Sequence, residues 1–175
     1  MAHFETTTVA RGPIERVAEA LRDELPRVAE HMSGVDRIEE IERRSMPGGA
    51  IHIVNVWYAA VEIPASLREL LGHSAFAWTD RAEWSAAGVR CRFRVEPHFL
   101  RECIRCKGET SLEDSMGGRA TRIRYEGDLE LGPLPGVGKL LGASRAVEQL
   151  VADLIVQNLQ ETGRALSRAL RHREP

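Results

Sequence analysis

The sequence predicts an α+β fold in which a curved antiparallel sheet of six to seven strands wraps around a long C-terminal helix. Between residues 50 and 131, short stretches alternate apolar and polar residues and are separated by turn-forming residues, which is typical of strands joined by hairpins. Residues 143–171 instead repeat apolar side chains every three or four positions, as in an amphipathic helix. A helix of that length measures roughly 40 Å and needs a large apolar surface to lie on, which the sheet would provide.

The composition indicates one globular domain spanning residues 1–175, with 43% hydrophobic and 29% charged residues. The formal net charge of −2 gives no bulk attraction to nucleic acid or to an anionic membrane. No apolar run approaches the ~18 residues of a membrane-spanning helix, and the first twelve residues lack the apolar core of a signal peptide. We therefore expect a cytoplasmic protein without a nucleic-acid partner or stable membrane insertion. The sequence leaves a homodimer open.

The N-terminal part of the chain predicts a strand followed by two helices. Residues 4–10 are rich in threonine and favour a strand, which the Gly12-Pro13 pair ends. Residues 14–25 carry an apolar stripe at helical spacing that stops at Pro26. Residues 28–32 suggest a second, short helix.

The next segment, residues 35–46, fits either a helix or a strand. Its isoleucine and valine residues recur every three positions, as in a helix. The tight turn at Pro47-Gly48-Gly49 and the strong strand pattern over residues 50–61 make a strand–turn–strand hairpin the more economical interpretation. Both faces of the 50–61 strand carry apolar residues, so the pattern does not decide which face points inward.

The middle of the chain predicts a short helix over residues 65–71 and then four strands. These strands cover residues 76–85, 89–95, 103–113 and 121–131, and each is bounded by glycine, proline or aspartate. A connector rich in glycine and proline, residues 132–138, joins the last strand to the C-terminal helix. That helix contains no proline, and Gly163 is its only weak point, at a cost of about 1 kcal/mol relative to alanine.

Four features recur together in a known superfamily. They are Gly108-Glu109 followed by Leu112 in the sixth strand, the turn at Gly117-Gly118, a seventh strand over residues 119–127, and a gripping helix over residues 147–166. In this order they resemble the helix-grip fold of the START/Bet v 1-like superfamily, also called SRPBCC or polyketide cyclase-like. Members bind lipids, sterols, polyketides or plant metabolites, and a minority are cyclases, dehydratases or hydrolases. The resemblance implies the fold more than the ligand.

Three polar residues interrupt apolar faces of the predicted elements. Asn55 lies between Ile53 and Trp57, Asp80 lies on a strand between two tryptophans, and Asn158 lies in the apolar stripe of the last helix. A polar group on an apolar face must form hydrogen bonds. Its partner is either in the protein or in water at an edge, or it is the polar head of a ligand held in a cavity.

Several other chemistries find no support in the pattern. The stretch at residues 132–139 has the wrong glycine spacing for a phosphate-binding loop. Cys91, His98, Cys103 and Cys106 lack the spacing of zinc ligands, so Cys91 and Cys106 are expected to be small buried hydrophobes. No nucleophile elbow is present. We expect no metal, no cofactor and no assigned catalytic residue.

The expected function is binding or transport of a hydrophobic small molecule, such as a lipid, a sterol or a polyketide-like compound, in a cavity between the sheet and the last helix. One alternative is an enzyme of the polyketide cyclase or dehydratase type that uses Asp80 or Tyr125 as acid or base. Another is a non-catalytic interaction module with a filled core. The expected ligand-binding residues are Asn55, Trp57, Trp78, Asp80, Trp84, Phe93, Ile123, Tyr125, Leu154 and Asn158.

Overall fold

The computed structural model describes residues 2–60, 76–98, 101–132 and 141–171, with the backbone alone described at residues 131, 141–151 and 154. Its strands form one seven-stranded antiparallel sheet in the order β1-β7-β6-β5-β4-β3-β2. The elements in chain order are β1 (Ala2–Arg11), α1 (Ile14–Asp23), α2 (Leu25–Ala29), β2 (Val35–Ser45), the 3₁₀ turn η1 (Pro47–Gly49), β3 (Ile51–Ala59), β4 (Ala77–Trp84), β5 (Arg90–Pro97), β6 (Ile104–Ser115), β7 (Ala120–Leu131) and α4 (Leu141–Arg171).

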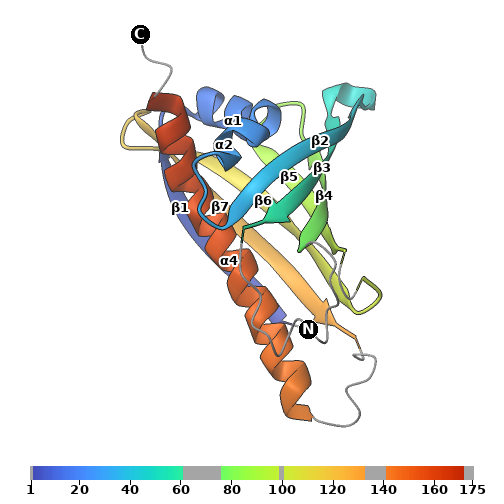
Figure 1. Ribbon diagram of the computed structural model, residues 1–175. Coiled ribbons are helices and arrows are strands. Elements are labelled where there is room, and N and C mark those ends of the chain that lie inside the picture. Colours follow the sequence, from blue (N-terminus) through green and yellow to red (C-terminus); the bar gives the residue numbers. More distant parts are fainter. Residues whose placement is uncertain (1, 61–75, 99–100, 133–140, 172–175) are drawn as a thin grey trace.

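The predicted helix-grip α+β fold is confirmed. The sheet curves around α4, which runs along its inner face beside β1 and β7, while α1 and α2 lie near the C-terminal end of α4 (Figure 1). Pro26 does not end the first helix as expected, because α1 already ends at Asp23 and Pro26 lies in the first turn of α2. The predicted helix at 65–71 and the connector after Gly132 lie outside the described residues. No helix in the described ranges is long and apolar enough to cross a bilayer.

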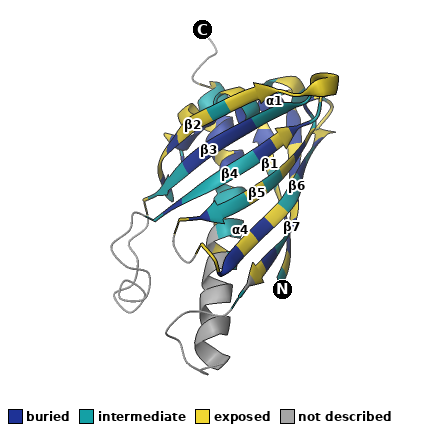
Figure 2. Cartoon of the chain, turned by 90° about the vertical axis from the view of Figure 1, so that its right-hand side faces the viewer, coloured by how far each residue is buried: buried dark blue, intermediate teal, exposed yellow. Residues whose placement is uncertain are grey.

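Alternation of side chains along the strands gives the sheet a buried inner face and a polar outer face. Figure 2 shows this most clearly along β6, where buried and exposed residues take turns. β3 departs from this alternation, because residues 53–56 are all buried, but its contacts settle its orientation. Asn55 and Trp57 line the cavity against α4, whereas Tyr58 lies on the outer face beside Arg37 and Glu39.

Two glycines on neighbouring strands leave room for aromatic rings. Gly108 and Gly127 are direct partners on β6 and β7. A Cβ on Gly108 would lie 2.6 Å from Cζ of Phe93, and a Cβ on Gly127 would lie 2.6 Å from Cζ of Phe4. The two phenyl rings therefore occupy the space that side chains at these glycines would fill. This packing brings Phe93 onto the floor of the cavity described below.

The helix α4 is fastened to β1 by hydrogen bonds from short side chains. The Thr8 hydroxyl donates to the carbonyl of Gln160 at 3.0 Å, and the Gln160 side chain donates to the Thr6 hydroxyl at 3.0 Å. About two helical turns further along, the backbone N–H of Arg11 donates to the Ser167 hydroxyl at 2.9 Å. These bonds fix the position of α4 along the sheet edge.

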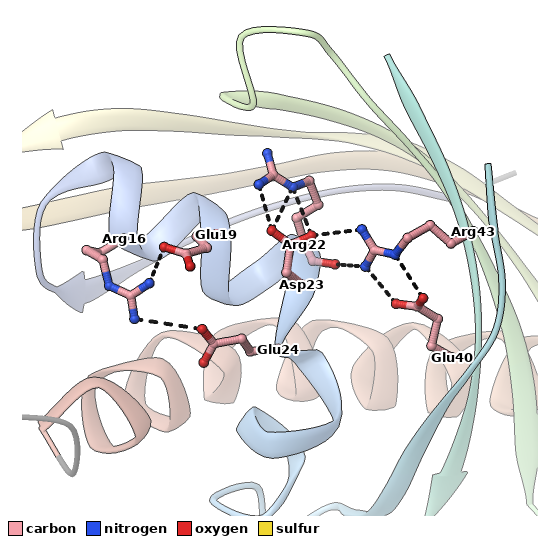
Figure 3. Close-up of polar contacts among 7 residues, drawn as sticks. All are labelled: Arg16, Glu19, Arg22, Asp23, Glu24, Glu40 and Arg43. Carbon is pink, nitrogen blue, oxygen red and sulfur yellow. Dashed lines mark hydrogen bonds and ion pairs between the residues drawn. The ribbon is translucent and has the colours of Figure 1, made fainter. Parts of the chain in front are cut away.

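A group of ion pairs ties α1 to β2 (Figure 3). The Asp23 carboxylate at the end of α1 accepts hydrogen bonds from Arg22, at 2.6 Å for Nη2, and from Nη1 of Arg43 on β2, at 2.8 Å. Arg43 also donates to Glu40 on its own strand and to the backbone carbonyl of Arg22. The helix end is thus held against the strand by both charge and hydrogen bonding.

Candidate ligand-binding cavity

A cavity of about 140 Å³ lies between the inner face of the sheet and α4. Its walls come from α1 and α2, from β3 to β7 and from the middle of α4, so it lies inside the grip of the sheet on the helix. The described residues that line it are Leu21, Leu25, Asn55, Trp57, Phe76, Trp78, Asp80, Ala82, Trp84, Cys91, Phe93, Val95, Pro97, Thr110, Tyr125, Ile155, Asn158, Leu159 and Thr162.

Most of the residues expected to bind a ligand line this cavity. Ile123 does not, because it is fully buried in the core beside the cavity. The side chain of Leu154 lies outside the described residues. The expected residues that the structure brings together are Asn55, Trp57, Trp78, Asp80, Trp84, Phe93, Tyr125 and Asn158.

Sequence reasoning missed several lining residues. Leu21 and Leu25 were identified only as helical core positions, and their pattern contains no signal that α1 and α2 close one side of the cavity. Thr110 could have been found, because it alternates inward on β6 and pairs directly with Tyr125 on β7. Thr162 lies four residues after Asn158, on the same face of α4.

Polar residues of the cavity are paired across two neighbouring strands. Asn55 on β3 is the direct cross-strand partner of Asp80 on β4, and the next pair on the same face of the sheet is Trp57 with Trp78. The two indole rings are stacked, with centroids 5.7 Å apart and planes 20° apart. The antiparallel register thus places an amide and a carboxyl beside a rigid pair of aromatic rings.

The carboxyl of Asp80 is buried, and this changes its pKa. Burial raises its pKa to about 7, and the nearby Trp57 only partly opposes this shift. Asp80 retains some accessible surface on the cavity wall, but its Oδ1 atom is buried. A carboxyl in this state is present in both protonated and ionised forms near neutral pH.

Three buried polar atoms have no hydrogen-bond partner within the described part of the chain. They are Nε1 of Trp57, Oδ1 of Asp80 and the hydroxyl oxygen of Tyr125. All three residues line the cavity. The Trp57 N–H lies close enough to the Asp80 carboxyl to influence its pKa, yet it completes no hydrogen bond of normal geometry with it. Polar atoms left unpaired in this way are rare in folded proteins and call for an explanation.

Tyr125 forms a second polar position deeper between β7 and α4. Burial raises the pKa of its phenol above the ordinary value, and the neighbouring Thr162 offsets this only in part. The Thr162 hydroxyl itself donates to the backbone carbonyl of Asn158 at 2.9 Å. The Tyr125 hydroxyl is therefore a protonated donor throughout the neutral pH range.

The cavity side of α4 is held in place by the loop that precedes β2. Glu161 accepts hydrogen bonds from the backbone N–H and the hydroxyl of Ser33, at 2.8 Å and 2.7 Å, and from the N–H of Gly34 at 3.4 Å. Gly34 is close to Asn158, since a Cβ on this glycine would lie 2.8 Å from Oδ1 of Asn158. These contacts limit how far the Asn158 amide can move away from the cavity.

The cysteines contribute buried thiols and no ion site. Cys91, Cys103 and Cys106 are all buried, and Cys91 lies on the cavity wall. Burial raises the pKa of the Cys91 thiol far above its usual range and that of Cys106 to about 12. Among the residues that the structure describes, no three histidine, cysteine or acidic side chains come together in a way that could hold a metal ion.

Comparison with solved structures identifies the fold. No protein-family model matches the sequence, and no curated protein matches it either. The protein TTHA0849 from Thermus thermophilus is 20% identical, with a TM-score of 0.69 over 99% of this chain and 100% of that one. The Zhui aromatase/cyclase from Streptomyces sp. R1128 is 17% identical, with a TM-score of 0.67 over 99% and 96% of the two chains. A START superfamily protein from Mycobacterium smegmatis is 10% identical, with a TM-score of 0.56 over 97% of each chain. At these identities the likeness establishes a START-like fold.

Proposed function

We propose, starting from a START-like helix-grip fold, that this protein binds a hydrophobic small molecule in the cavity between the sheet and α4. The main support is the set of three unpaired polar atoms, on Trp57, Asp80 and Tyr125, in an otherwise largely apolar cavity. Leaving a buried polar group without a partner costs about 1–3 kcal/mol. A ligand with a few polar groups on an apolar body would satisfy these atoms, which is the usual composition of a small-molecule site.

The size of the cavity narrows the class of ligand. Its volume is about 140 Å³, close to an engineered protein cavity of roughly 150 Å³ that holds benzene. It is smaller than the roughly 300–1,000 Å³ of most drug-sized sites. A compact ring system therefore suits this volume better than a long acyl chain. This favours a polyketide-like or other aromatic compound over a lipid.

Binding can be tested on the purified protein even though the ligand is unidentified. Native mass spectrometry of freshly purified protein should show a co-purified compound, or the emptied protein should bind small aromatic compounds. The stacked Trp57–Trp78 pair should then report binding through a change in fluorescence, and the melting temperature should rise. Ligand-free protein that shows neither change across a panel of aromatic, sterol and fatty-acid probes would favour an interaction module with a filled core.

A second candidate function is catalysis of the cyclase or dehydratase type, and the observation that favours it is Asp80. A carboxyl with a pKa of about 7 can accept and return a proton at neutral pH, which is what a general acid–base catalyst requires. In a dehydration, such a group would remove the proton beside a ketone and help the departing hydroxyl to leave as water. The likeness to a solved aromatase/cyclase is one of fold and adds no evidence for this step.

The catalytic candidate requires its own test. Wild-type protein should convert an aromatic β-hydroxy ketone to the dehydrated product faster than buffer, and the rate should change around pH 7. Asp80→Asn should bring the rate down to that of buffer, whereas Glu83→Gln, an exposed carboxyl on the opposite face of the same strand, should leave it unchanged. Equal rates for wild type and Asp80→Asn would exclude Asp80 as the catalyst while leaving binding intact.

A further inference from the structure

The unpaired atoms of Trp57 and Asp80 carry information about the ligand beyond its size. An indole N–H can only donate a hydrogen bond, whereas a carboxylate oxygen can only accept one. The two residues line the same cavity and lie close enough for Trp57 to influence the carboxyl, yet Nε1 and Oδ1 are both unpaired among the described residues. A single ligand group that satisfies both must accept one hydrogen bond and donate another.

We infer that Trp57 and Asp80 together form a recognition site for a neutral hydroxyl group on an aromatic ring, which accepts from Nε1 of Trp57 and donates to Oδ1 of Asp80. This inference rests on the proposed binding function and specifies its ligand. A phenol or a ring alcohol fits both atoms. An ether or a halide cannot donate to the carboxylate, and a ligand carboxylate would place a second negative charge beside Asp80.

The surroundings favour a ring as the carrier of this hydroxyl. The Trp57 ring is fixed by stacking on Trp78, so its N–H points in a set direction. Apart from Asn55, its cross-strand partner, the wall near Asp80 is aromatic or aliphatic, with Phe93 and Ala82 at nearby positions of the sheet. A flat apolar body can lie on this surface while its hydroxyl reaches the two polar atoms.

The test uses three naphthalene derivatives of similar shape. They are 2-naphthol, which donates and accepts, 2-methoxynaphthalene, which only accepts, and 2-methylnaphthalene, which does neither. Binding to the wild-type protein is measured by isothermal titration calorimetry at pH 8, where most of the Asp80 carboxyl is ionised and can only accept a hydrogen bond. We expect 2-naphthol to bind about tenfold tighter or better than 2-methylnaphthalene, since hydrogen bonds to charged groups contribute about 1.5–3 kcal/mol and 1.4 kcal/mol is tenfold. The methoxy compound should lie between them.

Variants then assign the preference to the two residues. Asp80→Leu replaces the carboxyl with an apolar group of similar size and should reduce the advantage of 2-naphthol to about twofold or less. Trp57→Phe should remove part of it while keeping an aromatic wall. Glu83→Gln, on the outer face of β4, is the matched control and should keep the full preference. The ligand series on wild-type protein remains decisive even where a variant fails to fold.

The outcomes separate this inference from the proposed function. If all three compounds bind equally well to the wild type, the cavity is a binding site but Trp57 and Asp80 do not recognise a hydroxyl. If 2-naphthol is preferred and Asp80→Leu keeps the full preference, another residue recognises it and the inference is wrong. If none of the three binds to ligand-free protein, both the inference and binding of compact aromatic ligands are contradicted.

Discussion

Gly163 of α4 lies directly against Thr8 of β1. A Cβ on this glycine would overlap the threonine hydroxyl and would lie 2.8 Å from its Cγ2 atom. Thr8 cannot easily turn away, because its hydroxyl donates to the carbonyl of Gln160 on the same helix. The glycine that looks like a weak point in the helix is therefore the position that lets α4 approach the sheet closely.

This contact reverses the usual effect of a glycine-to-alanine change in a helix. Helix propensity alone would stabilise Gly163→Ala by about 1 kcal/mol, but the added methyl group must displace Thr8 or shift α4. We expect the free energy of unfolding to fall by about 1–3 kcal/mol, as measured by urea denaturation. The double variant Thr8→Ala/Gly163→Ala should recover much of this loss, and Arg164→Ala at the exposed neighbouring position should change little. A stabilised Gly163→Ala would show that α4 does not lie this close to β1.

The long helix and the strands other than β2 could be predicted from their own side-chain patterns, which repeat regularly over many residues. The sequence left β2 ambiguous for a physical reason. The pairing of β2 with β3 shifts register between Val35 and Arg37 and again between Glu40 and Glu42. Such irregularities break the two-residue alternation, so Val35 and Ile38 are both buried although they are three residues apart. Three-residue spacing looks helical in a sequence.

The candidate site was predicted only in part. Asn55, Asp80 and Asn158 were identifiable because each interrupts an apolar face, and the structure gathers all three around one cavity. The direct pairing of Asn55 with Asp80 depends on strand register, which no local pattern specifies. The contributions of Leu21 and Leu25 likewise depend on how α1 and α2 are placed against the sheet. Local periodicity can assign a side chain to a face, but only the folded arrangement shows which faces meet.

The ion pairs between α1 and β2 should make stability depend on acid. Burial alone would raise the pKa of Asp23, but hydrogen bonds from Arg22 and Arg43 outweigh it and hold the pKa below its ordinary value. A lowered carboxyl pKa stabilises the fold above the unfolded-state value, near pH 4, and this contribution is lost as the pH falls through the folded-state pKa. Asp23→Asn should cost about 1 kcal/mol at pH 7.

The pH dependence of unfolding shows whether the stability lost in Asp23→Asn comes from charge. In urea denaturation repeated from pH 6 down to pH 2, the difference between Asp23→Asn and wild type should shrink as the wild-type carboxylate takes up a proton. Asp36→Asn is a suitable control, because its ion pair with Arg37 is more than half exposed and should contribute little at any pH. A difference that stays constant down to pH 2 would assign the cost to packing instead of charge.

Asp80 should affect the free energy of unfolding in a different pH range from Asp23, and it should lower stability as the pH rises. Its pKa is raised to about 7 in the folded protein, so the folded state holds a proton that the unfolded chain has already released. Stability therefore falls as the pH rises from about 4 to about 7 and then levels off. The loss between pH 5 and pH 8 should be about 3 kcal/mol in the ligand-free protein. Asp80→Asn should remove this slope and be the more stable protein at pH 8, whereas a slope that persists in the variant would place the titration elsewhere.

The buried thiols should be unreactive in the folded protein. Reaction requires the thiolate, and burial raises the pKa of Cys91 and Cys106 far above neutral values. We expect native protein to react with Ellman's reagent many times more slowly than protein in guanidinium, with all three cysteines titrating only after unfolding. Mass spectrometry of alkylated native protein provides the site assignment. Rapid native labelling of Cys91 would mean that the cavity opens readily to solvent.

Tyr125→Phe removes a buried hydroxyl that has no hydrogen-bond partner among the described residues, and it keeps the packed ring. The free energy of unfolding should therefore stay unchanged or rise by up to about 1 kcal/mol. The matched control is Tyr58→Phe. The Tyr58 hydroxyl donates to Glu39 at 3.2 Å, and its ring lies under the Arg37 guanidinium at 3.7 Å, so this change should cost a few tenths of a kcal/mol. A loss above about 1 kcal/mol for Tyr125→Phe in urea denaturation would show that the hydroxyl is already satisfied inside the protein and is not free to meet a ligand. A neutral or stabilising effect, combined with weaker binding of ligands that carry a second polar group, would mean that the hydroxyl is kept for binding at the expense of stability.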